Sequence, residues 1–169
     1  MKPRTDHELL WRMIKDIRFA MLTHRHADGT LHAHPMTMQN KSLDETDEVL
    51  YFFVGRASEV GRRLATDGSV NLAYVDPAKD VYVSIAGQAT VNEDPAIKKK
   101  LFNALDKAWF PDGADDRNLE LVEVRIRHAE YWNAKESRLS QLLKVATAAA
   151  THQQAHVGEH RELQVGQHG

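Results

Sequence analysis

The fold is decided by one stretch of the sequence, Arg18-Phe-Ala-Met-Leu-Thr-His-Arg-His-Ala-Asp-Gly-Thr-Leu-His-Ala-His-Pro-Met-Thr-Met-Gln39. Two strand-like segments flank Asp28-Gly29, which is a strong turn signal, so the stretch predicts a β-hairpin. The second arm contains Pro35, and proline has no backbone N–H to donate to a neighbouring strand. We therefore expect this arm to be irregular or to lie at a sheet edge, where free backbone groups can bind a ligand.

The 169 residues have an ordinary globular composition, with 42% hydrophobic and 27% charged residues, and their length favours a single domain. The formal net charge of −2 argues against a nucleic-acid or anionic-membrane partner. Cysteine is absent, which excludes disulfides, thiolate metal sites and cysteine nucleophiles. Because every apolar run is too short to span a membrane and the first residues do not resemble a signal sequence, we expect a cytoplasmic protein.

Hydrophobic periodicity predicts how helices and strands follow one another. Helices are expected over residues 6–17, 59–66, 95–108 and 137–151, and strands over 18–24, 31–39, 49–54, 69–75, 81–91 and 119–132. Gly87 should mark a bulge or bend in the long fifth strand. This pattern predicts an α+β fold, a small antiparallel β-barrel with peripheral helices, formed by residues 1–151 as one domain. Residues 152–169 are polar and rich in His and Gln, and we expect a poorly ordered tail or a segment that packs onto a partner.

The hairpin contains four histidines that suggest a zinc site: His24, His26, His32 and His34. If Asp28-Gly29 forms a two-residue turn, Arg25 pairs with His32, and the histidines of the two arms lie on opposite faces of the hairpin. In that register they cannot share one metal ion, and we expect no metal site. A three-residue loop would bring them to a common face, so this alternative stays open.

Several short motifs follow one another in an order typical of a known family: Met21-Leu-Thr23, Asp28-Gly29, His32-Ala-His-Pro-Met36, Phe52-Phe-Val-Gly-Arg-Ala-Ser58, Asn71-Leu-Ala-Tyr74, Trp109-Phe-Pro111 and Glu130-Tyr-Trp132. From about Leu9 to Trp132 the chain resembles the flavin-binding split barrels related to pyridoxamine 5′-phosphate oxidase, and within them the bacterial general stress proteins. The resemblance implies a six-stranded split barrel. It also implies a homodimer with two sites for flavin mononucleotide (FMN) at the subunit interface, with FAD as the alternative flavin.

The same resemblance implies which residues bind the flavin. The isoalloxazine edge would lie along the backbone of His34, Pro35, Met36, Thr37, Phe53 and Val54, while Trp109 and Phe110 would cover the ring. The phosphate end would include Arg56, Ser58, Glu59, Arg62 and Arg63, and the remaining cofactor-binding residues would be Tyr82 and Ser84. These residue types fit, because the ring needs apolar walls and backbone hydrogen bonds, while a phosphate is suited by a helix N-terminus with hydroxyl and guanidinium donors.

Two positions depart from the family pattern. Relatives commonly carry arginine at the position of His34 and lysine at the position of Glu59, so both changes remove positive charge from the phosphate end. After Trp132 nothing matches the C-terminal segment of the true oxidases, and we do not expect pyridoxamine phosphate oxidase activity. Two function classes remain open: an FMN-dependent oxidoreductase, and a binding or regulatory dimer that holds flavin without turnover. The sequence indicates no catalytic residue.

Overall fold

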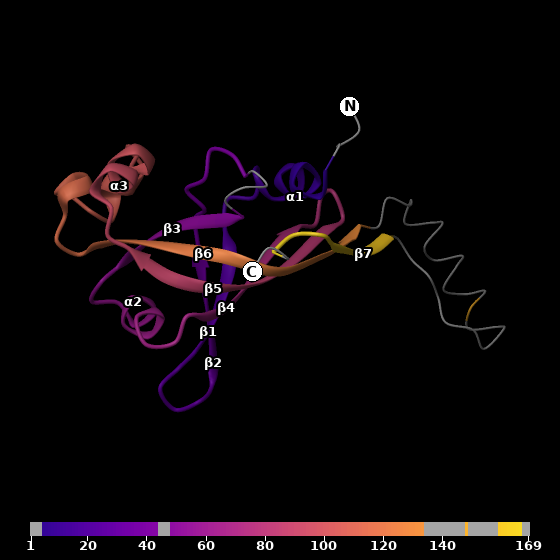
Figure 1. Cartoon of the computed structure of the whole chain (residues 1–169), viewed down its shortest axis with the longest axis horizontal. Helices are drawn as coiled ribbons and strands as arrows, with labels where there is room; N and C mark the ends of the chain where they lie inside the picture. The colour runs from indigo at the N-terminus through magenta and orange to yellow at the C-terminus, as the bar shows by residue number, and fades with distance from the viewer. Residues whose placement is uncertain (1–4, 44–47, 134–147, 149–158, 167–169) are drawn as a thin grey trace.

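The computed structural model describes residues 5–43, 48–133, 148 and 159–166. The elements follow in the order α1 (Asp6–Ile14), β1 (Ala20–Arg25), β2 (Leu31–Met36), β3 (Val49–Gly55), α2 (Glu59–Leu64), β4 (Ser69–Asp76), β5 (Val81–Asn92), α3 (Pro95–Leu101), the short 3-10 helices η1 (Asp106–Ala108) and η2 (Gly113–Asp115), β6 (Leu119–Asn133) and β7 (Glu159–Leu163). Figure 1 shows the strands as a curved sheet with the helices at its periphery. As far as the described residues extend, no helix has the length and apolar character needed to span a bilayer.

All the strands belong to one antiparallel sheet, in which β2, β1, β4, β5, β6 and β3 are neighbours in that order. One edge of β6 pairs with β5, while the other edge pairs with β3 in its first half and with β7 in its second half. An isolated bridge between Met38 and Phe52 connects the two ends of this path next to β2 and β3. The antiparallel α+β barrel predicted from the sequence is confirmed.

The bend predicted at Gly87 is also confirmed. The pairing of β5 with β6 shifts in register between Ala86 and Gly87. A Cβ atom at position 87 would lie 2.6 Å from Val124 Cγ1 and 2.8 Å from the Arg125 carbonyl oxygen, so no larger residue fits without displacing β6. The missing side chain therefore lets the two longest strands stay paired through the bend.

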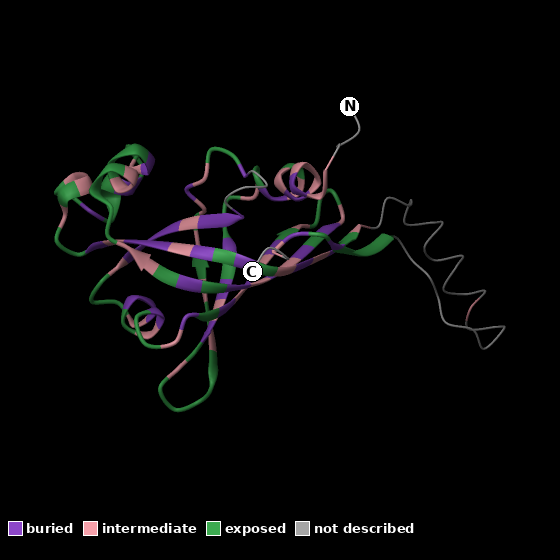
Figure 2. Ribbon diagram, viewed as in Figure 1, coloured by how far each residue is buried: buried purple, intermediate pink, exposed green. Residues whose placement is uncertain are grey.

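The core lies inside the curved sheet, and burial alternates along the strands as the period of two requires (Figure 2). The main cluster includes Leu10 and Ile14 of α1, both completely buried, with the inward-facing residues of the strands. A smaller cluster beside α3 is formed by Phe53, Leu101, Phe110, Leu119 and Leu121. Helix α1 thus covers the main cluster, while α3 covers the smaller cluster on the opposite face of β3 and β6.

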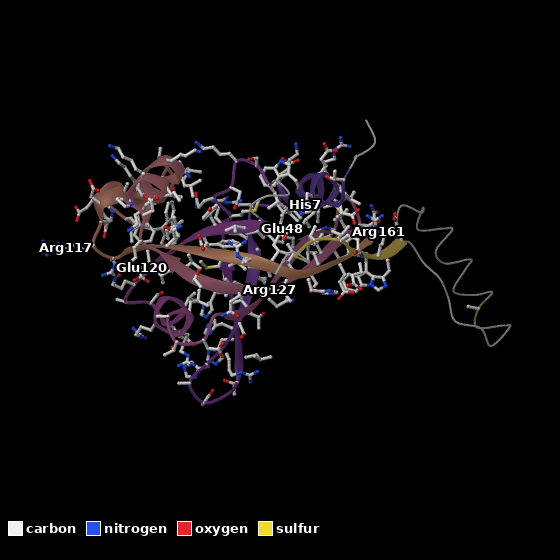
Figure 3. The ribbon with its side chains drawn as sticks, in the orientation of Figure 1. His7, Glu48, Arg117, Glu120, Arg127 and Arg161 are labelled. Atoms are coloured by element: carbon white, nitrogen blue, oxygen red, sulfur yellow. The ribbon has the colours of Figure 1, made fainter. Side chains whose placement is uncertain are left out.

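The C-terminal segment differs from the tail expected over residues 152–169, because Glu159–Leu163 adds a seventh strand to the six expected. Leu163 and Val165 are buried in the main cluster. The Gly166 N–H donates a 2.9 Å hydrogen bond to Glu48 Oε1, and His7 Nε2 lies 2.7 Å from the same oxygen. Figure 3 labels His7 and Glu48 close to α1 and Arg161 where β7 runs. Two apolar residues in a polar segment are a weak sequence signal, yet they are enough to fix it to the barrel.

Other predicted bounds need correction. The helix expected over 6–17 ends at Ile14, the strand expected over 31–39 ends at Met36, and the helix expected over 95–108 ends at Leu101. The last difference has a local cause, since the Asp106 carboxylate accepts hydrogen bonds from the Asn103 backbone N–H and the Gln39 side-chain amide, at 2.8 and 3.2 Å. These bonds hold the chain in a turn where the helix would otherwise continue. The helix expected over 137–151 lies outside the described residues, apart from Ala148.

Replacing Leu163 with alanine tests whether β7 completes the core. We expect Leu163→Ala to lower the free energy of unfolding by about 2–4 kcal/mol, because burial of the leucine is lost and a cavity remains. Urea unfolding followed by circular dichroism measures the change. Leu105→Ala is the matched control, since Leu105 is 79% exposed and its loss should change stability by less than about 0.5 kcal/mol. Equal stability of the two variants would show that β7 does not pack on the barrel in solution.

Candidate functional site

The hairpin loop contains three residues, and the register based on a two-residue turn is wrong. His24 pairs with His32, and the His26 N–H donates to the Thr30 carbonyl at 2.8 Å. Asp28 stabilises this loop, because its carboxylate accepts the Thr30 N–H at 2.9 Å, and Gly29 adopts a φ of 88°. A loop of three residues that ends in a left-handed glycine is a common hairpin connection. The three-residue loop, which the sequence left open as an alternative, is therefore correct.

The new register places all four hairpin histidines on the inward-facing side of the hairpin. His24 is 1% exposed and continues the buried row of β1, while the other three are partly exposed. The rings form two stacked pairs, His24 with His34 at 5.1 Å between centroids and His26 with His32 at 4.4 Å. We call these four residues the histidine cluster. It faces the start of α2.

Helix α2 brings Glu59 to the histidine cluster. Ser58 caps the helix, since its hydroxyl accepts the Gly61 N–H at 3.1 Å and donates to the Gly55 carbonyl at 2.6 Å. The helix packs closely on the end of β3, because a Cβ at Gly61 would lie 2.3 Å from the Gly55 carbonyl oxygen. This close packing fixes the first helical residue, Glu59, beside the hairpin.

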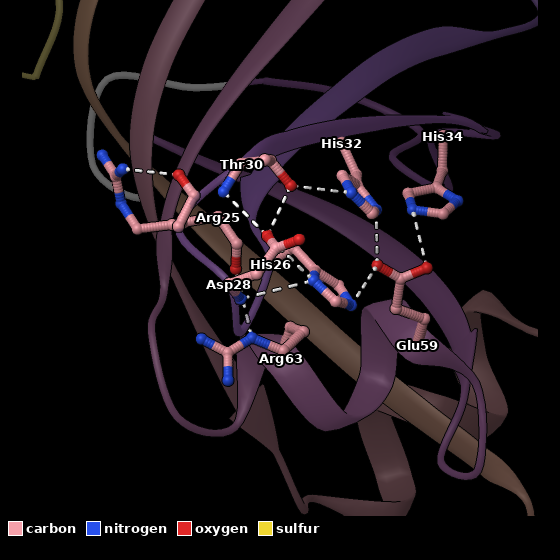
Figure 4. A network of polar contacts seen from close by, with 9 residues as sticks. Arg25, His26, Asp28, Thr30, His32, His34, Glu59 and Arg63 are labelled. Carbon is pink, nitrogen blue, oxygen red and sulfur yellow. Dashed lines mark hydrogen bonds and ion pairs between the residues drawn. The ribbon is translucent and has the colours of Figure 1, made fainter.

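The Glu59 carboxylate lies among the imidazoles, as Figure 4 shows. Its Oε1 is 2.7 Å from His32 Nδ1 and 3.5 Å from His26 Nε2. Its Oε2 is 4.0 Å from His34 Nε2. The two carboxylate oxygens therefore face different members of the histidine cluster.

Burial and neighbouring charges shift two pKa values in this cluster. Burial lowers the pKa of His34, and His24 and His32 act in the same direction, while the charge of Glu59 partly opposes them. For Glu59, burial acts to raise the pKa, but the hydrogen bond to His32 and the charges of the surrounding histidines outweigh it and lower the pKa. Glu59 is therefore a carboxylate and His34 tends to be a neutral imidazole at neutral pH. Such a pair can accept a proton, bind a cation or accept a hydrogen bond from a ligand.

The arginines expected at the phosphate end are engaged elsewhere. The Arg62 guanidinium donates to the Ala57 carbonyl, and Arg63 Nε donates to the Arg25 carbonyl at 3.1 Å. Arg56 Nε lies 2.9 Å from the Glu120 carboxylate. Ser58 uses its hydroxyl as the helix cap. Of the five residues expected around a phosphate, Glu59 is the one whose side chain points into the histidine cluster.

The residues expected along a flavin ring edge lie on the two end strands of the sheet. His34, Pro35 and Met36 belong to β2, which pairs with β1 in the described part of the chain, and Thr37 directly follows. Phe53 and Val54 belong to β3 and are buried. Between these strands the Met38–Phe52 bridge is the one described pairing, with Gln39 N–H donating to the Tyr51 carbonyl at 2.8 Å. Backbone groups of two edge strands thus border this end of the barrel.

Four other expected site residues lie apart from Glu59. Tyr82 and Ser84 are on the outer face of β5, where Tyr82 is 41% exposed and Ser84 Oγ accepts a hydrogen bond from the Asn71 amide. Trp109 is 80% exposed, and Phe110 is buried in the smaller core cluster beside α3. Figure 1 shows α3 on the other side of β3 and β6 from the hairpin. One chain therefore does not gather all the expected residues around one point.

The sequence-based site omitted His24, His26 and His32, which contact one another, His34 or Glu59 in the structure. Their signal was present as four histidines on alternating positions of one hairpin. A two-residue turn hides this signal, although Asp28-Gly29-Thr30 also fits a three-residue loop with an aspartate cap. One residue in the loop length decides whether these histidines share a face.

Sequence comparison links the chain to one family. A sequence model of the family described as Pyridoxamine 5'-phosphate oxidase like matches residues 5–156. General stress protein 26 of Bacillus subtilis is 37% identical over 57 residues, which are 34% of this chain and 40% of that protein. The chain thus aligns with less than half the length of this curated relative.

Solved structures share the fold. The general stress FMN/FAD binding protein of Xanthomonas citri has a TM-score of 0.65 and 30% identity, covering 78% of this chain and 90% of that chain. A structure described as general stress protein 26 from Jannaschia sp. CCS1 has a TM-score of 0.66 and 19% identity, covering 90% and 94%. The resemblance stated from the sequence motifs is confirmed, and with it the split-barrel fold.

The electrostatic coupling between Glu59 and His34 can be measured directly. We expect Glu59→Gln to lower the pKa of His34 further, because the carboxylate charge is what acts to raise it. Titration of the imidazole C–H resonances by NMR, in protein treated with a chelator, gives the value. Glu120→Gln is the matched control, since that carboxylate pairs with Arg56. An unchanged or higher pKa of His34 in Glu59→Gln would contradict this arrangement.

Proposed function

The chain belongs to the Pyridoxamine 5'-phosphate oxidase like family, and on this premise we propose that it is a cytoplasmic, flavin-binding oxidoreductase that works as a homodimer. The flavin is FMN, with FAD as the alternative. One observation carries the proposal: the Xanthomonas citri structure described as an FMN/FAD binding protein is 30% identical over most of both chains.

The end strands β2 and β3 support a site for the isoalloxazine ring. A planar ring needs apolar walls and backbone hydrogen bonds to its polar edge. The segments around His34 and Phe53 offer edge-strand backbone, and the half-buried Met36 and Met38 offer polarisable apolar surface. When bound, a flavin supplies hydride or electron transfer, while the protein positions it and sets its electrostatic environment.

The phosphate end fits a flavin less well. Glu59 carries a negative charge there, and Arg56, Arg62 and Arg63 have partners within the chain. A phosphate carries almost two negative charges at neutral pH and would be repelled by this carboxylate. We therefore expect this protein to prefer FMN over riboflavin less strongly than relatives with lysine at this position. True pyridoxamine phosphate oxidase activity is not part of the proposal.

The outer face of the sheet supports the homodimer. Met21, Val75, Tyr82 and Trp132 are all 40% or more exposed on this face. The pairing of β4, β5 and β6 places Val75 beside Tyr82 and Tyr82 beside Trp132 in one row. An exposed apolar row of this kind is typical of an interaction site. A second copy that packs on this face would bury the row.

The experiment that tests the function uses the purified full chain, freed of metal with a chelator and titrated with FMN. We expect saturable binding with the perturbed absorption bands of oxidised flavin, and bleaching of these bands when a reduced nicotinamide nucleotide is added without oxygen. Binding without bleaching by NADH or NADPH would favour the non-catalytic flavin-binding dimer. Failure to bind FMN, FAD and riboflavin would overturn the proposal.

A charge-reversal variant tests the placement of the phosphate. We expect Glu59→Lys to bind FMN about tenfold more tightly and riboflavin with nearly unchanged affinity, because only FMN carries the phosphate. Glu93→Lys, an exposed glutamate outside the site, gives the same change in net charge and serves as the control. Equal shifts for both ligands in Glu59→Lys would mean that Glu59 lies away from the phosphate.

The dimer is tested by one charged residue on the outer face. We expect the wild-type chain to sediment as a dimer at micromolar concentration and Val75→Glu to sediment as a monomer, because a carboxylate cannot be buried there without a partner. Leu105→Glu is the matched control, since Leu105 is exposed and lies outside this row. A wild-type monomer, or a Val75→Glu dimer of equal strength, would count against this interface.

A further inference from the structure

The histidine cluster and Glu59 contain two sets of potential metal ligands. The ligand atoms of His24, His34 and Glu59 all lie within 4.8 Å of one another, and so do those of His26, His32 and Glu59. Each set consists of two imidazole nitrogens and a carboxylate oxygen. Zinc and similar divalent ions favour this combination, and three protein ligands leave an open position for water or substrate.

Glu59 belongs to both sets and its two oxygens face different histidines. Oε1 is closest to His32 and His26, and Oε2 is closest to His34. A carboxylate in this position can bind one ion through each oxygen. The carboxylate is fixed by the start of α2 and the imidazoles by the hairpin, so both sets are built on paired or capped backbone.

His24 gives an independent indication of a ligand. It is 1% exposed, and neither ring nitrogen has a hydrogen-bond partner among the described residues. His34 Nε2 is likewise buried without a hydrogen bond. A buried polar atom without a partner is costly, and native proteins normally satisfy it. A metal ion between His24, His34 and Glu59 would satisfy these nitrogens.

The second set has the supporting contacts that metal-binding histidines need. His26 presents Nε2 to Glu59, while its Nδ1 lies 3.1 Å from the Asp28 carboxylate. His32 presents Nδ1 to Glu59, while its Nε2 lies 3.0 Å from Thr30 Oγ1. Outer contacts of this kind orient the ring and make the ligating nitrogen more basic. The residues that define the hairpin loop are therefore also placed to orient the ligands.

From these observations we propose that the histidine cluster and Glu59 bind a pair of divalent transition-metal ions of the zinc class, with the Glu59 carboxylate bridging them. His24 and His34 hold one ion, and His26 and His32 hold the other. Ligand atoms around a tetrahedral zinc ion lie about 3.3 Å apart, so small side-chain rotations complete both sets. The site does not depend on flavin.

Metal titration of the flavin-free, chelator-treated full chain tests the proposal. We expect Zn²⁺ to bind at two equivalents per chain by calorimetry, and Co²⁺ to develop the visible absorption of low-coordinate sites with the same stoichiometry. Zn²⁺ should also raise the melting temperature, because it binds the folded chain more tightly than the unfolded one. Since no flavin is present, failure here leaves the proposed flavin function untouched.

Variants assign the two ions. His34→Gln and His32→Gln should each lose one equivalent, and Glu59→Gln should weaken the binding of both ions by about 100-fold or more. His128→Gln, which removes an exposed histidine near Glu162, is the matched control and should retain two equivalents. Circular dichroism confirms that each variant is folded. One equivalent in the wild type, binding that His32→Gln and His34→Gln do not reduce, or no binding would each overturn the proposed pair.

Discussion

The pairing of β5 with β6 is the constraint on which the barrel depends. These are the longest strands, and β6 also holds β3 and β7 on its other edge. A flat ladder of this length could not close around a core, so the pair has to bend without losing its hydrogen bonds. The register shift at Gly87, where any side chain would collide with β6, makes this possible. The core, the end strands and the C-terminal segment all take their positions from this bent pair.

Within this barrel, two local features determine which side chains meet at the site. A three-residue loop puts the hairpin histidines on the inward side, and the close contact between Gly61 and Gly55 fixes the start of α2 opposite them. The first helical residue then meets four imidazoles. With lysine in this place the helix start would attract anions, whereas with Glu59 it attracts cations. The sign of the charge at the start of α2 therefore depends on one side chain, and changing it needs no change in the backbone.

Much of the fold could be predicted because it rests on local patterns. Alternating apolar residues identified the strands, and Gly87 identified the bend, since period and steric demand are visible in the sequence. Loop length was not visible in this way, because Asp28-Gly29 fits both a two-residue and a three-residue hairpin. The observed register combines the local Asp28–Thr30 hydrogen bonds with the burial of His24. The sequence pattern did not indicate strand β7 either. Its two buried residues have a partner surface only after β6 and Glu48 are in place. Arg62 and Arg63 illustrate the same limit, since the carbonyl groups of Ala57 and Arg25 reach them only in the folded chain.

The position of β7 has a consequence for how the chain acquires its structure during synthesis. Leu163, Val165 and Gly166 fill one end of the core and complete the bonding of a buried carboxylate that also contacts α1. They are synthesised after all the other strands that the structure describes. While they are still in the exit tunnel, the nascent barrel has an open end, with apolar surface and an unpaired edge of β6 available to other molecules. The exposure ends when Glu159–Leu163 pairs with β6, so β7 also protects the barrel against association through this strand edge.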